Sequence, residues 1–405
     1  MNTSPTALVS RRRFVGDLTV AGSGLLLAGS SGSPLLAASK QAYKGPNVIL
    51  IRFGGGARRR ESIDPRHTHT PFTCHELVRR GVLYSRMEID QLLDLNTSHG
   101  EGTLNLITGC YEKYRDIGET RADASRKLLG ARFEAQVPTL FEYLRASFDV
   151  PDHQALIVNG EDRGDEEFYN FSNHHLFGVS YRSQTLSLRR YKGWLLREQL
   201  AEHKWDGKAL LEKQAELRKL EDIDYRATKE TGQGAEIATF WANWRRYYGE
   251  SGLVNPRGDR LLTELALRAI KELQPRLMMI NYHDCDYVHW GYFSHYTRAL
   301  SIMDDGIKQI VAAVGNNPEY RDNTVFAIVP DCGRDDNPFM NVPCQHHFNS
   351  RAAHEIFALF FGRGIARGQV VDRRTQQISV ARTLAQCMGF SAEHAKGPVL
   401  PEVFS

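Results

Sequence analysis

One stretch has the greatest weight for the expected fold, the run NVILIR at residues 47–52, which leads into the glycines Gly54-Gly55-Gly56. Its continuous apolar character predicts a strand that is buried on both faces, and the glycines predict a turn at the carboxyl end of that strand. Strands buried in this way occur in parallel sheets that carry helices on both sides. We therefore expect strand and helix patterns to alternate along the chain.

Such an alternation is present downstream. Short apolar runs predict strands at 82–89, 155–158, 277–281, 324–329 and 356–361. Apolar residues at helical spacing predict helices that include 103–107, 138–144, 259–273, 294–314 and 380–388. We therefore predict an α/β fold, a three-layer α/β/α arrangement with a mainly parallel central sheet. Charged residues alternate with Leu and Trp from about 181 to 255, which predicts a mostly helical insertion.

The composition is that of a globular protein. The 405 residues are 41% apolar and 24% charged, and their formal net charge is +3. A disordered chain has fewer aromatic and β-branched residues and lies further from neutrality. The balanced charge also provides no basic field, so nucleic acid is not an expected partner. By length, two or three domains fit, and so does one large α/β domain with an insertion.

The N-terminal residues have the pattern of an export signal. Arg11-Arg12-Arg13 precede an apolar stretch rich in Gly and Ala, and the small residues Ala37-Ala38 follow it. This order defines a secretory signal, and paired arginines are typical of the twin-arginine type. We therefore predict a signal peptide at 1–38 and a periplasmic or secreted domain at 39–405. A membrane anchor at the N-terminus is the alternative, and no later segment has the ~18 consecutive apolar residues of a membrane span.

Potential metal ligands gather next to several predicted strands. Ligands of parallel sheets bind outside the carboxyl ends of the strands, and Asp, His and Cys are the usual ligands of zinc and related ions. Asp and His also populate ordinary polar loops, but their recurrence at several strand ends favours a metal site. These clusters contain His283, Asp284, Asp286, His289, Asp331, Cys332, Arg334, Asp335, Asp336, Cys344, His346, His347 and His354.

The order of these pieces resembles the alkaline phosphatase superfamily, which also contains sulfatases, nucleotide phosphodiesterases and cofactor-independent phosphoglycerate mutases. The strand at 47–51 is similar to the family's opening strand, and the helix at 378–388 to its closing helix. Between them lie segments similar to the family's nucleophile turn, its Asp-and-His metal segment, its Ser-Asp-His-Gly segment and its last histidine. These segments are Asn96-Thr97-Ser98-His99-Gly100 with Thr108-Gly109-Cys110-Tyr111, Asn281–His289 followed by Gly291, Pro330-Asp331-Cys332-Gly333, and His346/His347 followed by Gly362 and Gly364.

The resemblance implies a two-metal site that acts on phosphate or sulfate esters. One ion would polarise the substrate and stabilise the leaving oxygen, and the other would lower the pKa of a Ser or Thr nucleophile. The implied cofactor is one or two divalent ions, with zinc expected and calcium or manganese as alternatives. The implied ligands are Asp286 and His289 for one ion, completed by His346, His347 or His354, and Asp331 and Cys332 for the other.

Two positions depart from the family's pattern. Gly54 stands where the family's first strand ends in a metal-binding Asp, and Cys332 stands where a His is expected. A thiolate binds zinc well, so Cys332 changes the expected ligand without removing it. Loss of the carboxylate at position 54 removes negative charge from the second ion, and Glu61 or Asp64 would be its substitute. The glycine turn resembles a group of exported bacterial proteins of unassigned function more than it resembles a standard alkaline phosphatase.

Three neighbouring residues are candidate catalytic groups. In relatives the nucleophile lies about ten residues before the glycine of the Thr-Gly pair. That count from Gly109 reaches His99, and a small shift reaches Ser98 and then Thr97, which are the expected nucleophiles. The same residues also fit an ordinary helix N-cap.

Arg58, Arg59 and Arg60 directly follow the glycine turn. Guanidinium groups match phosphate or sulfate oxygens, so these residues would bind a substrate anion, and a solvated charged loop is the alternative. We predict an exported, metal-dependent hydrolase of a small anionic ester. A catalytically degenerate protein of the same fold that binds a metal or an anion is the alternative. The sequence gives no prediction of the oligomeric state.

Overall fold

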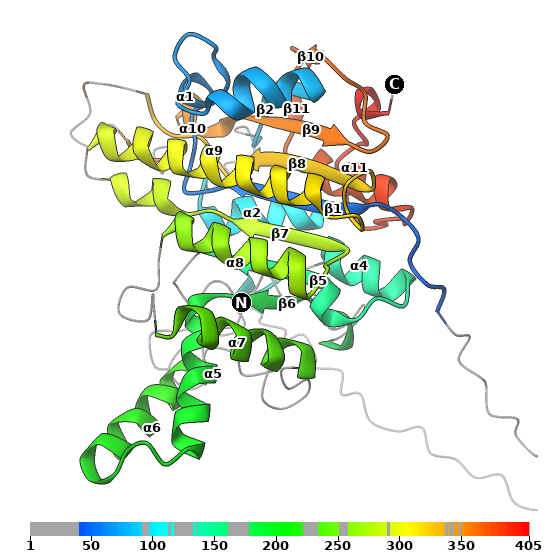
Figure 1. The fold of residues 1–405 in the computed structure, drawn as a ribbon. Helices are drawn as coiled ribbons and strands as arrows, with labels where there is room; N and C mark the ends of the chain where they lie inside the picture. The colour runs from blue at the N-terminus through cyan, green and yellow to red at the C-terminus, as the bar shows by residue number, and fades with distance from the viewer. Residues whose placement is uncertain are drawn as a thin grey trace, which may run out of the picture. The chain divides into compact units, whose positions relative to one another are not determined.

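In the computed structural model of the protein (Figure 1), residues Lys40–Ser405 belong to one unit of the chain. Within it the described residues are 40–90, 97–111, 115–116, 133–135, 137–160, 177, 179–221, 234–250, 258–289, 292–336, 339, 344–346 and 350–404. The predicted signal peptide at 1–38 lies outside the described residues. Among the helices that are described, none is long and apolar enough to span a membrane.

A sheet of nine described strands forms the centre of the unit. All its described strand pairs are parallel except those that β9 makes with β2 and β8. The mostly parallel sheet, with helices on both sides, confirms the predicted α/β fold. The spatial order is β10 (Gln369–Val371), β2 (Gly81–Glu88), β9 (Glu355–Gly362), β8 (Thr324–Pro330), β1 (Asn47–Phe53), β7 (Leu277–Asn281), β5 (Ala155–Asn159) and β6 (Gln184–Leu186), and β11 (Thr375–Gln376) also pairs with β2.

β1 lies between β7 and β8 and is buried along its whole length. Ile49, Ile51 and Phe53 belong to the core on one face of the sheet, and Val48 and Leu50 belong to the core on the other. Successive side chains of a strand point to opposite faces, so a strand covered on both sides needs an apolar residue at every position. This requirement explains why the run at 47–52 is apolar without alternation.

Helices cover both faces of the sheet (Figure 1). The first face packs against α8 (Asp259–Glu272), α9 (Phe293–Asn316), α5 (Leu188–Ala201) and α7 (Ala235–Tyr248). The opposite face packs against α2 (His99–Thr108), α4 (Leu140–Ser147) and α11 (Ser379–Met388). Short helices complete the described elements, namely α1 (Arg59–Ile63), η1 (Phe72–Leu77), η2 (Val78–Arg80), η4 (Asp152–Gln154), η6 (Val179–Tyr181), η7 (Asp284–Val288), α10 (Arg351–His354) and η8 (Pro401–Val403), and β3 (Arg115–Asp116) pairs with β4 (Phe133–Glu134).

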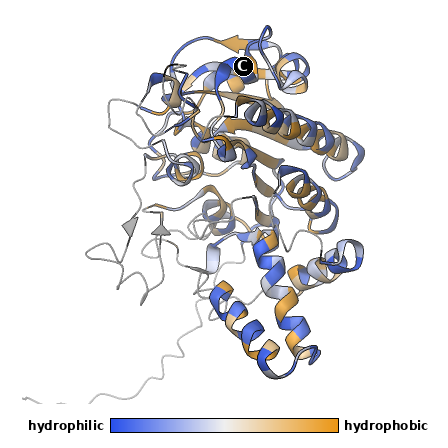
Figure 2. Cartoon of the chain, turned by 90° about the vertical axis from the view of Figure 1, so that its left-hand side faces the viewer, coloured by the Kyte–Doolittle hydropathy of each residue, from blue (hydrophilic) through white to orange (hydrophobic). Residues whose placement is uncertain are grey.

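The segment predicted as a helical insertion contains α5, α6 (Gly207–Glu221) and α7, and it also supplies the edge strand β6. α5 and α6 lie side by side and extend away from the sheet in both views (Figures 1 and 2). α6 buries none of its residues fully, whereas α5 and α7 contribute Trp194, Trp241 and Trp244 to the core. The short strand β6 has three residues, which is too few for a period of two to be recognised in the sequence.

The N-terminus of α2 is held against the segment that follows β8. Ser98 caps α2 by accepting a hydrogen bond from the backbone N–H of Glu101. A Cβ atom at Gly102 would lie 2.2 Å from the carbonyl oxygen of Asp331, so α2 approaches this segment as closely as its backbone allows. The buried amide of Gln377 donates to the carbonyls of Pro330 and Asp331 at 3.1 and 2.8 Å. The position of α2 therefore depends on glycine at 102.

We expect Gly102→Ala and Gly193→Ala to change stability in opposite directions. In a helix interior Ala is normally more stable than Gly by about 0.5–1 kcal/mol. At Gly193, in α5, no atom lies within 4 Å of an added Cβ, so Gly193→Ala should raise the free energy of unfolding by that amount. Gly102→Ala should lower it by about 1–3 kcal/mol, because the new methyl group meets the Asp331 carbonyl. Urea denaturation of both variants tests this, and equal stabilisation by the two would contradict the packing of α2.

Candidate metal centre

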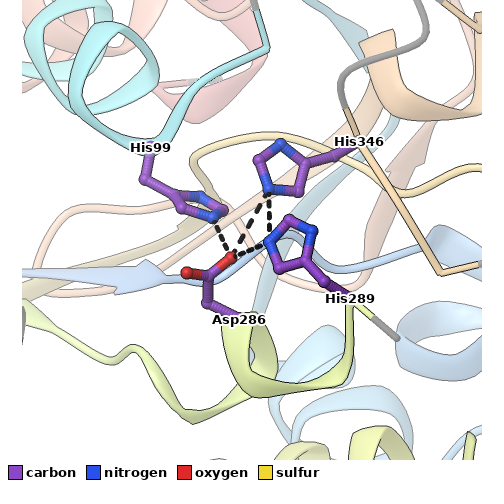
Figure 3. Close-up of side chains that lie close together, drawn as sticks. All are labelled: His99, Asp286, His289 and His346. Atoms are coloured by element: carbon purple, nitrogen blue, oxygen red, sulfur yellow. Dashed lines mark hydrogen bonds and ion pairs between the residues drawn. The ribbon is translucent and has the colours of Figure 1, made fainter. Parts of the chain in front are cut away.

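Three neighbouring strands bring the predicted clusters together. β8, β1 and β7 are adjacent and parallel, so the segments that follow them lie at one edge of the sheet. These segments are the glycine turn 54–56, η7 with His289, and the residues from Asp331 onward. The N-terminus of α2 lies against the last of them through Gly102. Figure 3 shows the side chains that meet at this edge.

Three imidazoles converge on one carboxylate oxygen of Asp286 (Figure 3). The Nε2 atoms of His99, His289 and His346 lie 2.7, 2.5 and 3.5 Å from Oδ1 of Asp286. Each of the four residues offers one ligand atom, and these atoms lie within 4.8 Å of one another. Asp286 and His289 are three residues apart on one helical turn, a spacing that places both side chains on the same side.

The second ring nitrogen of each histidine faces an oxygen atom. Nδ1 of His289 lies 2.6 Å from Oε1 of Gln345, and Nδ1 of His346 lies 2.8 Å from the carbonyl of Thr97. Because these oxygens accept, Nδ1 carries a hydrogen in both rings, and Nε2 is the ring atom left to bind a metal ion. Metal-binding histidines have this arrangement, in which the outer hydrogen bond fixes the tautomer and the ring orientation. The residues therefore fit a divalent ion among the four side chains.

The four-residue group is buried but not closed. The side chains of His99, Asp286 and His346 are 6, 5 and 1% exposed, and that of His289 is 20% exposed. Burial raises the pKa of Asp286, but hydrogen bonds from His289, His346 and His99 outweigh burial and hold that pKa far below its ordinary value. Asp286 is therefore a carboxylate at any physiological pH. A ligand can reach the group from the side of His289.

A reciprocal pair of carboxylates fixes the start of η7. Asp259, at the first position of α8, accepts from the backbone N–H groups of His283 and Asp284 at 2.9 and 3.0 Å. Asp284 in turn accepts from the backbone N–H of Asp259 at 2.9 Å. Burial and the charge of Asp284 raise the pKa of Asp259 well above its ordinary value. η7, and with it Asp286, is thereby tied to α8.

A second group shares His99 with the first and adds Asp331 and Cys332. Nδ1 of His99 lies 2.8 Å from Oδ2 of Asp331 and 3.8 Å from Sγ of Cys332. Burial, followed by the charge of Asp331, raises the pKa of the Cys332 thiol to about 11. Burial opposes a charged His99, but Asp331, Cys332 and Asp286 outweigh it and raise the pKa of His99 well above its ordinary value. His99 is therefore the side chain that joins the two groups.

The glycine turn passes between the segments that follow β7 and β8. A Cβ atom at Gly54 would lie 1.9 Å from the carbonyl oxygen of Tyr282. Gly55 and Gly56 have φ values of +79° and +77°, which favour glycine, and the buried guanidinium of Arg334 donates to both of their carbonyls. No side chain fits at position 54. A carboxylate at this position is therefore incompatible with the observed backbone.

Several of the predicted site residues lie elsewhere or have other partners. Arg58 forms a two-point ion pair with Glu61 at 2.7 and 2.9 Å, and Arg59 pairs with Glu355. Arg59 and Arg60 line a surface pocket of about 540 Å³. Asp64, the other substitute considered for the missing carboxylate, pairs with His67 at 2.8 Å.

The remaining predicted site residues also lie outside the two groups or have other partners. His354 lies outside both groups, with Nδ1 3.0 Å from the carbonyl of Ile89, and His347 lies outside the described residues. Thr97 donates its hydroxyl to the carbonyl of His346, and Ser98 caps α2. Arg52 and Gln345 both contact the site, through Asp331 and His289, although neither was predicted from the sequence. A charged residue in an otherwise apolar buried strand was the available signal for Arg52.

Comparison with solved structures identifies the fold. The structure of the wild-type alkaline phosphatase PafA matches with a TM-score of 0.55 and 10% sequence identity, over 90% of this chain and 100% of that chain. The structure of BT1596, a 2-O GAG sulfatase, matches with a TM-score of 0.52 and 12% identity, over 89% of this chain and 74% of that chain. No protein-family model matches the sequence, and no curated protein sequence matches it. This chain therefore has the alkaline phosphatase fold, as the order of its sequence motifs predicts.

Proposed function

We propose that this protein is a metal-dependent hydrolase of phosphate or sulfate esters. The proposal depends above all on the convergence of His99, His289 and His346 on the carboxylate of Asp286. Proteins of the same fold include an alkaline phosphatase and a 2-O GAG sulfatase. A divalent ion held by these four residues would supply Lewis acidity toward an ester oxygen. The ester approaches from the side of His289, where the group is exposed.

Zinc is the ion that we propose for this site. Imidazole nitrogens with one carboxylate oxygen are a donor set that suits zinc. Calcium prefers a shell of oxygen ligands, so the three imidazoles of His99, His289 and His346 disfavour it. Manganese is the alternative. Gln345 and the carbonyl of Thr97 keep the two outer histidines in the tautomer that binds a metal.

Ser98 is the proposed nucleophile. Its hydroxyl lies at the N-terminus of α2, whose positive end stabilises developing negative charge. It also lies 3.4 Å from Oε2 of Glu101, a carboxylate that can accept its proton. The hydroxyl of Thr97 is buried and donates to the carbonyl of His346. Both ring nitrogens of His99 face carboxylates. Of Thr97, Ser98 and His99, Ser98 is therefore the residue most available to attack an ester.

A metal-binding protein without turnover is the second candidate function. Four protein ligands close a tetrahedral zinc site, whereas catalytic zinc sites usually have three and an open position. His99 supplies the fourth donor here, and this observation favours the second candidate. Catalysis by this site requires expansion to five ligands or release of His99. Turnover measurements on the zinc-loaded protein distinguish the two functions.

We also propose that residues 1–38 direct export through the twin-arginine route. Support comes from Arg11-Arg12-Arg13, the apolar stretch that follows them and the small residues Ala37-Ala38. Replacing the three arginines by lysine should retain the full-length chain in the cytoplasm, and Arg66→Lys, at an exposed position, should not. Fractionation and intact-mass measurement of the exported protein test this. Equal export of the triple-lysine variant would exclude the twin-arginine route.

We expect loss of any one of the four ligands to weaken zinc binding strongly. His289→Ala and His346→Ala should each lower zinc affinity by more than 100-fold, because a ligand is removed from a preformed set. Gln345→Ala should lower it by about 10-fold, because it removes the group that orients His289. His67→Ala, at an exposed histidine outside the group, is the control. Competition with a fluorescent chelator measures each affinity, and unchanged binding by His289→Ala would exclude this metal site.

Ser98 is tested by variants that separate its capping role from a catalytic one. Asn caps a helix as well as Ser does, so Ser98→Asn should retain the stability of the protein and its zinc content. If Ser98 is the nucleophile, Ser98→Asn should lower kcat by about 1,000-fold or more, and Ser98→Thr should retain part of the activity. Turnover of aryl phosphates, phosphodiesters and aryl sulfates is the measurement. Full activity of Ser98→Asn would leave Ser98 with the capping role alone.

A further inference from the structure

We infer that this chain binds one metal ion, at His99, Asp286, His289 and His346, and that the guanidinium of Arg52 takes the place of a second ion beside Asp331. The inference deepens the proposed hydrolase and rests on that proposal for the presence of the first ion. It assigns a different task to each of the two candidate groups. The contacts of Arg52, Gly54 and Asp331 support it.

Arg52 is fully buried beside the second group. It occupies the penultimate position of β1 and is 0% exposed. Its guanidinium donates to Oγ1 of Thr103 and, at 3.4 Å each, to the carbonyls of His99 and Tyr282. Nη1 lies 3.8 Å from Oδ2 of Asp331. A permanent positive charge therefore lies next to the Asp331 carboxylate. It is held by α2 and by the segments that follow β7 and β8.

The guanidinium fills the space that a side chain at position 54 would need. An added Cβ at Gly54 would lie 2.9 and 3.0 Å from Nε and Nη2 of Arg52, besides its closer contact with the backbone of Tyr282. Gly54 and Arg52 therefore fit together as a pair. The absence of a carboxylate from position 54 and the presence of a buried cation beside it are two aspects of one arrangement.

The carboxylate of Asp331 already has donors on both oxygens. Oδ1 accepts from the backbone N–H groups of Gly56 and Cys332 at 3.2 and 2.8 Å. Oδ2 faces Nδ1 of His99 at 2.8 Å and the guanidinium of Arg52. This is the geometry of a carboxylate that orients a metal-binding histidine, here by directing Nε2 of His99 toward Asp286. An ion bound to Asp331 would have to displace His99 from Oδ2 and lie next to Arg52.

The hydrogen bonds, more than the charges, distinguish the two groups. Each buried carboxylate of the site is near a buried guanidinium, with Arg52 at 3.8 Å from Asp331 and Arg334 at 3.9 Å from Asp286. Buried charges are stable when paired and hydrogen-bonded. Asp331 accepts from two backbone N–H groups and faces Nδ1 of His99, whereas three imidazole Nε2 atoms face Oδ1 of Asp286. The single ion therefore belongs to the Asp286 group, and the charge beside Asp331 is supplied by Arg52.

Metal stoichiometry tests the inference without any measurement of turnover. We expect the zinc-loaded, dialysed protein to contain 1 zinc per chain by elemental mass spectrometry, and Cys332→Ser and Arg52→Lys to contain 1 as well. His289→Ala should contain none. In the cobalt-loaded protein we expect no thiolate-to-metal charge-transfer band, because Cys332 does not bind the ion. Arg66→Lys, at an exposed arginine, is the control for handling.

Two zinc ions per chain, with a decrease to one in Cys332→Ser or a thiolate band with cobalt, would overturn the inference. A content near zero in the wild-type protein would overturn it as well. One zinc per chain without turnover would support the inference and contradict the proposed hydrolase. Two zinc ions with turnover would do the reverse, so the failure of one proposal is distinguishable from the failure of the other.

Discussion

The imidazole of His99 lies between two buried carboxylates, 2.7 Å from Asp286 and 2.8 Å from Asp331. These carboxylates follow different strands, β7 and β8. His99 begins α2, which packs on one face of the sheet, whereas η7 packs on the other. The ring therefore links three segments that are distant in the sequence. Because water is excluded there, each carboxylate requires a donor, and removal of His99 would leave both with fewer partners. The geometry of the whole site depends on this contact.

Glycine makes this arrangement sterically accessible. Gly102 allows α2 to approach the carbonyl of Asp331, and Gly54 allows β1 to end against the carbonyl of Tyr282. The same absence of a side chain at Gly54 leaves room for the guanidinium of Arg52. The backbone thus determines the charge distribution: where a carboxylate cannot fit, a cation from the same strand is accommodated. A fixed cation beside Asp331 follows from this packing.

The sequence predicted the strands that matter and several of the residues that meet at their ends. β1, β7 and β8 coincide closely with the predicted runs, because strands buried on both faces are apolar throughout. Asp286, His289, Asp331 and His346 were named as ligands, and they lie within one or other candidate group. His99 was named as a catalytic candidate by counting residues, and it lies among the donors. Arg58 and Arg59 were assigned to a substrate anion, and they pair with Glu61 and Glu355.

The sequence predicted the strands but not the partners of the charged side chains, and this difference has a physical cause. Periodicity and residue type are local properties, so they were sufficient for the layers, the mostly parallel sheet and the edge at which polar residues gather. The choice of partner for a charged side chain depends on contacts between residues that are far apart in the sequence, such as Arg52 with Asp331 and His99 with Asp286. Only the tertiary structure shows that Gly54 has no space for a side chain, that Asp331 faces Nδ1 of His99, and that the buried Arg52 lies beside Asp331. The glycine turn was visible in the sequence. Packing decided that no carboxylate fits at Gly54 and that the guanidinium of Arg52 lies beside it.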